Sequence, residues 1–185
     1  MINIRKGVFE TNSSSSHSIV VTKANNDTQY NIDAGWRVDK TGILSFWDDD
    51  LEFGRYPFKF LYNWYHRLCY AIASANTTSS DFQAQLDVIR NICKKHINNF
   101  KDFKFPIEHS WNENEEDEII YGWVDHQSAS LLDEFLEKYH VDLEDFIFND
   151  NYIVIIDGDE YQIFNDMKEA KIINDDFIET RMEAF

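Results

Sequence analysis

The chain has 185 residues, of which 43% are hydrophobic and 16% aromatic, and it carries a formal net charge of −17 at pH 7. This composition excludes wholesale disorder, because it supplies enough apolar area to offset the entropy lost on folding. The length suits a single domain over residues 1–185. With no apolar signal-peptide core and no run of about 18 apolar residues, we expect a cytoplasmic protein that does not cross a membrane.

The negative charge is confined to the second half of the chain. Residues 1–100 hold 10 Asp and Glu against 11 Lys and Arg, whereas residues 101–185 hold 24 acidic residues against 6 basic ones. A surface of this sign repels phosphate, so we expect no direct nucleic-acid binding. It attracts a basic surface instead, such as the groove in which another protein holds DNA or RNA.

The first half predicts three strands and then two long helices. Strands are predicted at residues 18–23, 29–33 and 43–47 from β-branched or alternating patterns. A helix of about five turns is predicted from Pro57, because apolar residues then recur every three or four positions. Ser80 and Gln83 have the spacing of a capping box and predict the start of a second helix, antiparallel to the first.

The second half predicts further helices and a hairpin. Residues 112–118 form a charge run that we interpret as a solvated loop, and Ser128 is predicted to cap the next helix. Residues 152–156 and 161–164 flank an Asp-Gly turn and predict a β-hairpin. One more short helix is predicted at residues 174–185. The predicted fold class is therefore α+β, with three to four helices and a small, mainly antiparallel sheet.

Polar side chains gather near the N-terminus between two apolar stretches. They are Arg5, Glu10, Asn12, Ser13, Ser14, Ser15 and His17. Such a loop could bind a phosphate or nucleotide through Arg5 and the hydroxyls, or pair Ser14 with His17 as a nucleophile. The alternative is a polar turn between two strands. The segment contains neither a P-loop nor a Gly-x-Ser-x-Gly elbow.

The string from Ile4 to Ser18, IRKGVFETNSSSSHS, resembles the start of a group of uncharacterised proteins from bacteriophages and mobile elements. Those proteins open with a similar Arg, Val-Phe-Glu-Thr-Asn-Ser-Ser-Ser and His-Ser pattern. The resemblance covers about 15 residues and implies a phage origin and a location in the host cell. It implies no particular activity.

Three functions remain open on this evidence. The first is a phage-encoded acidic protein that inhibits a host defence nuclease, such as a CRISPR effector or a restriction enzyme, by presenting a nucleic-acid-like surface. Its binding residues would be Glu113, Glu115, Glu116, Asp117 and Glu118, with a second patch at Asp142, Glu144, Asp145 and Asp150. The second is a small enzyme or nucleotide-binding protein that uses the N-terminal polar loop. A virion or replication accessory role is a third possibility.

No cofactor and no metal are expected. The His and Asp residues lack the helical i, i+4 spacing of a zincin, and Cys69 and Cys93 fall in helical patterns that indicate buried reduced thiols. The aromatic residues that begin at Phe58 run around a helix, which indicates a helix buried on most sides. The sequence does not indicate an oligomeric state.

Overall fold

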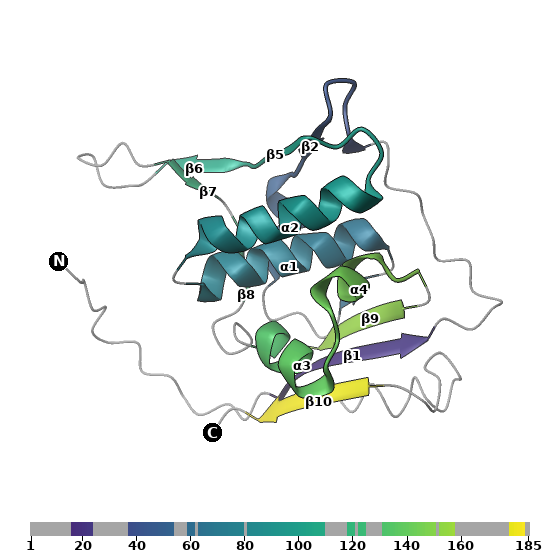
Figure 1. The fold of residues 1–185 in the computed structure, drawn as a ribbon. Helices are drawn as coiled ribbons and strands as arrows, with labels where there is room; N and C mark the ends of the chain where they lie inside the picture. Colours follow the sequence, from purple (N-terminus) through teal and green to yellow (C-terminus); the bar gives the residue numbers. More distant parts are fainter. Residues whose placement is uncertain are drawn as a thin grey trace.

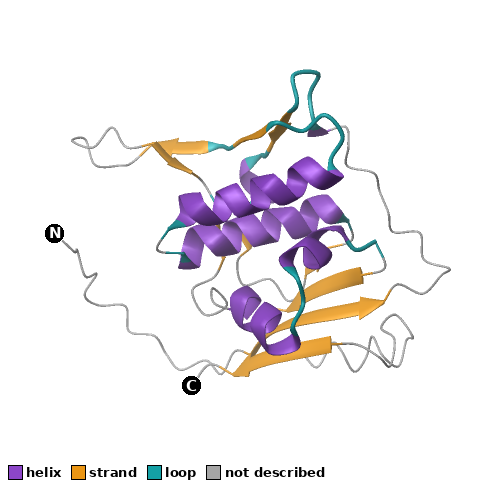
Figure 2. Ribbon diagram, viewed as in Figure 1, coloured by secondary structure: helices purple, strands orange, loops and turns teal. Residues whose placement is uncertain are grey.

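The computed structural model describes residues 16–23, 37–53, 59–61, 63–79, 81–109, 118–120, 122–124, 131–150, 152–157 and 178–183. At its centre two helices, α1 (Trp64–Thr78) and α2 (Phe82–His96), lie side by side (Figures 1 and 2). A four-stranded sheet lies on one side of this pair, and strands β2, β5, β6 and β7 lie on the other (Figure 1).

The four-stranded sheet has the order β10-β1-β9-β4. Its members are β1 (Ser16–Lys23), β4 (Lys59–Leu61), β9 (Tyr152–Asp157) and β10 (Ile178–Glu183). Ile19 pairs with Ile156 on one side and with Thr180 on the other, in both cases antiparallel. Ile19 and Val21 are buried because alternate residues of a strand face the same side. The strand predicted at residues 18–23 is confirmed.

Strand β9 lies inside this sheet and corrects the predicted hairpin. The proposed partner, residues 161–164, lies outside the described residues. Both edges of β9 are already taken at residues 154–156, by β1 and by β4, so the hairpin prediction is wrong. A continuous apolar strand such as residues 152–156 is typical of the centre of a sheet, where a strand pairs with one neighbouring strand along each edge.

The two central helices start at caps that differ from the predicted ones. α1 begins at Trp64, after the side chain of Asn63 accepts a hydrogen bond from the backbone N–H of His66 at 3.0 Å. The predicted start at Pro57 is wrong, since residues 59–61 form an edge strand of the sheet. α2 is capped by Asp81, which accepts from the N–H of Ala84 at 3.1 Å. Residues 67–75 of α1 are all buried, as expected for a helix covered on most sides, but Phe60 of the aromatic run lies in the strand β4 and not in the helix.

The remaining strands form three separate pairs rather than extending one sheet. β2 (Ile43–Ser45) pairs in parallel with β5 (Asp102–Lys104), and β3 (Glu52–Phe53) pairs in parallel with β8 (Trp123–Val124). β6 (Ile107–His109) and β7 (Glu118–Ile120) are antiparallel. The prediction of one small, mainly antiparallel sheet is therefore wrong, although the fold is mixed α+β. Two parallel strands must be joined by a long crossover, which between β2 and β5 includes α1 and α2. A local sequence pattern does not predict pairing between strands so far apart in the chain.

Two shorter helices follow in the second half. α3 (Leu131–Tyr139) contacts β1 and β10, and α4 (Leu143–Phe148) packs against α1. The helix predicted at residues 174–185 is wrong, because residues 178–183 form β10. Ile178 and Thr180 are β-branched residues that suit the edge of the sheet beside β1.

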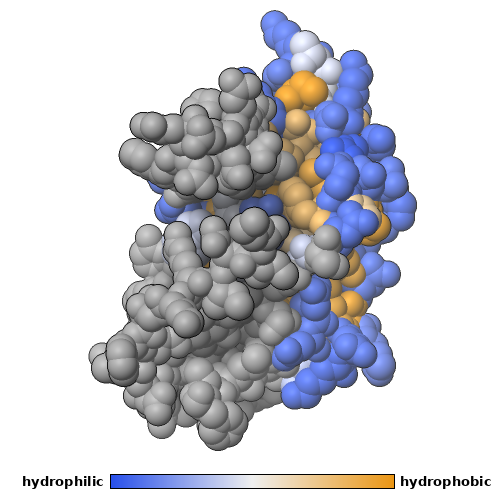
Figure 3. All heavy atoms as spheres, turned by 90° about the vertical axis from the view of Figure 1, so that its left-hand side faces the viewer, coloured by the Kyte–Doolittle hydropathy of each residue, from blue (hydrophilic) through white to orange (hydrophobic). Residues whose placement is uncertain are grey.

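A hydrophobic core joins these elements, and the fully buried side chains include Leu68, Phe135 and Phe146. Cys69 and Cys93 are buried free thiols, as expected. Seen from the side, hydrophobic residues also form a band on the described surface, with hydrophilic residues along one edge of it (Figure 3). The apolar side chains of Trp47, Val88 and Trp123 are the large ones that stay exposed in the described part of the chain.

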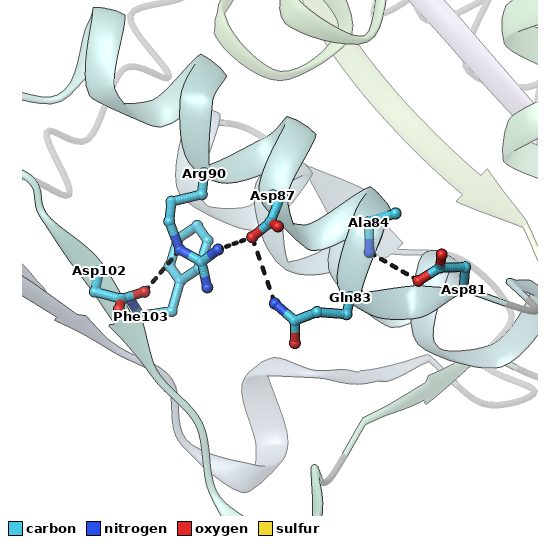
Figure 4. A network of polar contacts seen from close by, with 7 residues as sticks. All are labelled: Asp81, Gln83, Ala84, Asp87, Arg90, Asp102 and Phe103. Carbon is cyan, nitrogen blue, oxygen red and sulfur yellow. Dashed lines mark hydrogen bonds and ion pairs between the residues drawn. The ribbon is translucent and has the colours of Figure 1, made fainter.

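A polar network on the outer side of α2 holds this helix against β5 (Figure 4). The Arg90 guanidinium donates to Asp102 Oδ1 through Nε at 2.8 Å and also pairs with Asp87. Its carbon lies 5.9 Å from the centroid of the Phe103 ring. The N–H of Phe103 donates to the same Asp102 oxygen, so one carboxylate ties the helix to the strand.

Candidate functional site: an acid-lined pair of hollows

The structure tests little of the N-terminal prediction. Arg5, Glu10, Asn12, Ser13, Ser14 and Ser15 lie outside the described residues. His17 lies in β1, with its backbone opposite Met182 of β10. The structure also describes little of the first acidic cluster. Glu118 is the first residue of β7, and the other members lie outside the described residues: Glu113, Glu115, Glu116 and Asp117.

The second acidic patch is well described and lies on α4 and its two ends. Asp142 caps the helix by accepting a hydrogen bond from the N–H of Glu144 at 2.8 Å. Glu144 and Asp145 occupy the first turn, where carboxylates interact favourably with the N-terminal ends of the peptide dipoles. Asp150 follows the last turn. The six-residue helix therefore brings four carboxylates of the patch to one short element.

Two hollows adjoin this patch. The larger hollow has a volume of about 510 Å³, and the smaller hollow has a volume of about 240 Å³. The described residues lining the larger hollow are Val38, Asp39, Trp64, His96, Ile97, Asn98, Asn99, Phe148 and Asp150. The smaller hollow is lined by His96, Asp142, Glu144, Asp145, Phe148 and Asn149. Five carboxylates thus surround the pair, and no Lys or Arg belongs to the described lining.

Three aromatic rings form a stacked wall that both hollows share in part. The rings of His96 and Phe148 are 4.4 Å apart between centroids and inclined by 9°. Trp64 stacks on the other side of Phe148 at 5.8 Å and 22°. His96 comes from the end of α2, Phe148 from the end of α4 and Trp64 from the start of α1. Only the packing of these three helices brings the rings together.

Glu144 fastens α4 to the end of α2. Lys95 Nζ donates to Glu144 Oε2 at 2.5 Å, and His96 Nε2 lies 2.7 Å from Glu144 Oε1. The hydrogen bond from Lys95, followed by that with His96, holds the pKa of the Glu144 carboxyl below its usual value. Glu144 therefore fixes the orientation of the His96 ring against Phe148.

Asp39 also lines the larger hollow. Its Oδ1 accepts hydrogen bonds from the Thr41 hydroxyl at 2.6 Å, the Thr41 N–H at 2.7 Å and the Ile43 N–H at 3.0 Å. The bond from the Thr41 hydroxyl is the main reason why the pKa of Asp39 lies below its usual value. The side chain is therefore ionised at neutral pH and fixed in position by the turn.

A buried arginine lies behind this surface. Arg67 of α1 is 0% exposed, and its Nη1 donates to the backbone carbonyl of Asn149 at 2.8 Å. Burial lowers the pKa of Arg67 to about 10, while the nearby charge of Asp150 acts in the opposite direction. The guanidinium stays protonated at neutral pH and holds the end of α4 against α1.

Two carboxylates of the patch are available to a ligand. Asp145 and Asp150 are exposed, and neither takes part in a salt bridge or a side-chain hydrogen bond with any described residue. Asp145 lines the smaller hollow and Asp150 lines the larger one. Each hollow therefore has one carboxylate with no salt bridge or side-chain hydrogen bond to a described residue, although Asp150 also interacts electrostatically with the buried Arg67.

Comparison of the chain with protein-family models, curated proteins and solved structures gave no match. Within the described ranges, no three His, Cys, Asp or Glu side chains lie close enough to hold a metal ion. The described helices include none that is long and apolar enough to cross a membrane.

A second polar cluster has a structural role. The Arg37 guanidinium lies 4.0 Å from the Trp47 ring centroid and 4.6 Å from that of Tyr65, and donates to Asp50 at 3.1 Å. Tyr65 donates its hydroxyl to the same carboxylate at 2.6 Å. Burial raises the pKa of Tyr65, so the phenol remains a protonated donor. The cluster fixes the segment before α1.

Sequence reasoning identified the carboxylates of the second patch but missed the rest of the hollows. Asp39, Trp64, His96 and Phe148 belong to four segments that are distant in sequence, and no local spacing connects them. The one available signal was the density of acidic residues around α4.

Proposed function

We propose that this protein acts by binding a partner protein that has a basic surface. In the leading case, that surface is the nucleic-acid groove of a host defence nuclease such as a CRISPR effector or a restriction enzyme, which the protein inhibits. The observation that carries the proposal is the pair of adjoining hollows, which are lined by five carboxylates and no described Lys or Arg.

Charge and shape both support binding at this place. Carboxylates around a hollow attract cations and raise the rate of encounter with a basic surface. Asp145 and Asp150 have no salt bridge to lose when a partner binds. The aromatic wall adds apolar area of the kind that anchors protein interfaces. A hollow gives such a contact a position, which a uniformly acidic surface does not.

The experiment is capture of the partner from host extract with the immobilised protein at two ionic strengths. Capture should weaken as salt rises, and added duplex DNA or RNA should release the partner. Replacing Asp145 and Asp150 with Asn removes two interactions of roughly 1 kcal/mol each in solvent, which should weaken binding by about 30-fold.

The matched control removes the same charge elsewhere. Glu134 and Glu137 are exposed residues of α3, away from both hollows. Their replacement by Gln removes two negative charges, as many as the replacement of Asp145 and Asp150 by Asn. Capture by this control should stay close to that of the natural protein. Equal loss in both double variants, or a partner that nucleic acid does not displace, would contradict the proposal.

A further inference from the structure

The larger hollow has features that select one kind of cation. Its wall consists of the near-parallel rings of Trp64, Phe148 and His96. The face of an aromatic ring attracts cations, and a planar guanidinium can also stack on such a face. Because Phe148 lies between the other two rings, the open faces of the wall belong to Trp64 and His96. A compact, strongly hydrated ammonium gains less from this wall.

Several residues with acceptor groups line the larger hollow. Asp39 and Asp150 carry carboxylates, and Asn98 and Asn99 carry side-chain amide oxygens. A guanidinium presents five N–H donors in one plane, whereas an ammonium presents three. The lining therefore offers acceptors for several donors of a flat group at the same time.

Two cations close to the larger hollow are already bound. Lys95 donates to Glu144 at 2.5 Å, and the buried Arg67 donates to the carbonyl of Asn149 at 2.8 Å. Neither lines the hollow. The volume of about 510 Å³ is within the usual range of ligand pockets, so the end of a long side chain fits.

The chain binds one of its own arginines by the same combination of groups. Arg37 lies against the rings of Trp47 and Tyr65 and pairs with the carboxylate of Asp50. In the larger hollow, rings and carboxylates are also combined, but no internal guanidinium is present among the described lining residues.

We propose that the larger hollow binds the guanidinium of an arginine side chain on the partner protein, stacked on an outer face of the wall formed by Trp64, Phe148 and His96 and paired with Asp39 and Asp150. This inference rests on the proposed function and specifies the group that the acidic surface recognises. Lysine side chains then contribute to encounter through long-range attraction, and arginine determines the position of binding.

The test uses three capped tripeptides, Gly-Arg-Gly, Gly-Lys-Gly and Gly-citrulline-Gly, titrated into the full ¹⁵N-labelled chain and followed by amide chemical shifts. The arginine peptide should shift the amides of Asn98, Asn99 and Asp150 in a saturable way. The lysine peptide should bind about tenfold more weakly, because it loses the stacking and the planar hydrogen bonds. Citrulline, which is planar but neutral, should not bind measurably.

Two variants test whether the peptides bind in the larger hollow. Phe148→Leu keeps apolar bulk but removes the central ring that positions the Trp64 and His96 rings, so the hollow should bind the arginine and lysine peptides with nearly equal affinity. Asp150→Asn changes an exposed side chain and should weaken both peptides while the preference for arginine remains. Because Asp150 has no side-chain hydrogen bond to lose, this variant gives a result even where Phe148→Leu disturbs folding.

Equal affinities for the arginine and lysine peptides on the natural chain, or shifts centred outside the larger hollow, would overturn the inference. If partner capture still depends on Asp145 and Asp150 in that case, the proposed function stands without the arginine selectivity. If the arginine peptide binds as expected but capture ignores those carboxylates, the proposed function fails and the guanidinium site remains.

Discussion

Replacing Gly42 with Ala should destabilise the fold through a conflict that the structure places beside the larger hollow. Gly42 has φ of 92°, which costs an L residue about 1–2 kcal/mol. A Cβ atom there would lie 2.4 Å from the backbone oxygen of Asn99 and 2.9 Å from Cγ of Lys101. The first neighbour is backbone, so the turn at residues 97–101 must move.

The size of the effect follows from these two terms. Overpacking of this kind adds about 1–3 kcal/mol to the conformational cost, so the free energy of unfolding should fall by about 3 kcal/mol. For a chain of this length the midpoint of thermal unfolding should drop by roughly 6–12 °C. Because Asn99 lines the larger hollow, binding of the arginine tripeptide should weaken as well.

Urea and thermal unfolding followed by circular dichroism measure the effect. Lys40→Ala is the control, because Lys40 is exposed in the same turn and its replacement should change stability by less than about 0.5 kcal/mol. A Gly42→Ala protein within that margin of the natural chain would refute the reasoning, since both the left-handed backbone and the contact with Asn99 would then be wrong.

Three further predictions concern buried or paired polar groups. Tyr65→Phe should lower the free energy of unfolding by about 2 kcal/mol, because the variant loses a hydrogen bond to a carboxylate. Tyr70→Phe should leave stability unchanged or raise it, since the buried Tyr70 hydroxyl has no hydrogen-bond partner among the described residues. If urea unfolding showed the same loss of stability in both variants, this prediction would be contradicted. Arg67→Met keeps the apolar stem but removes the hydrogen bond from the Arg67 guanidinium to the carbonyl of Asn149, so the free energy of unfolding should fall by about 2 kcal/mol, and an unchanged midpoint in urea would contradict this role. The pKa of Glu144 is depressed in the fold, so its contribution to stability is present above pH 4.5 and is lost as the pH falls through the lower folded-state value. The stability difference between the natural chain and Glu144→Gln should therefore be small but measurable at pH 7 and should vanish on acidification; a difference that persists in acid would show another cause.

The sequence by itself determined the features that depend on neighbouring residues. The strand at residues 18–23, the two long helices and α3 follow from β-branched runs and from three- and four-residue spacing, because these patterns reflect a single element. The acidic patch around α4 was visible for the same reason. Burial of α1 on most sides was also apparent from its aromatic residues.

Only the tertiary structure decided how strands pair and what surrounds the acidic patch. Residues 59–61 and 178–183 became sheet strands rather than helix, because Leu61 is buried against β9 and because β1 accepts a partner along each edge. The parallel pairs join strands separated by two helices. The aromatic wall likewise requires Trp64, His96 and Phe148 to meet at three helix ends. Contacts of this kind depend on the packing of distant segments, and a sequence pattern records only the face that each segment buries.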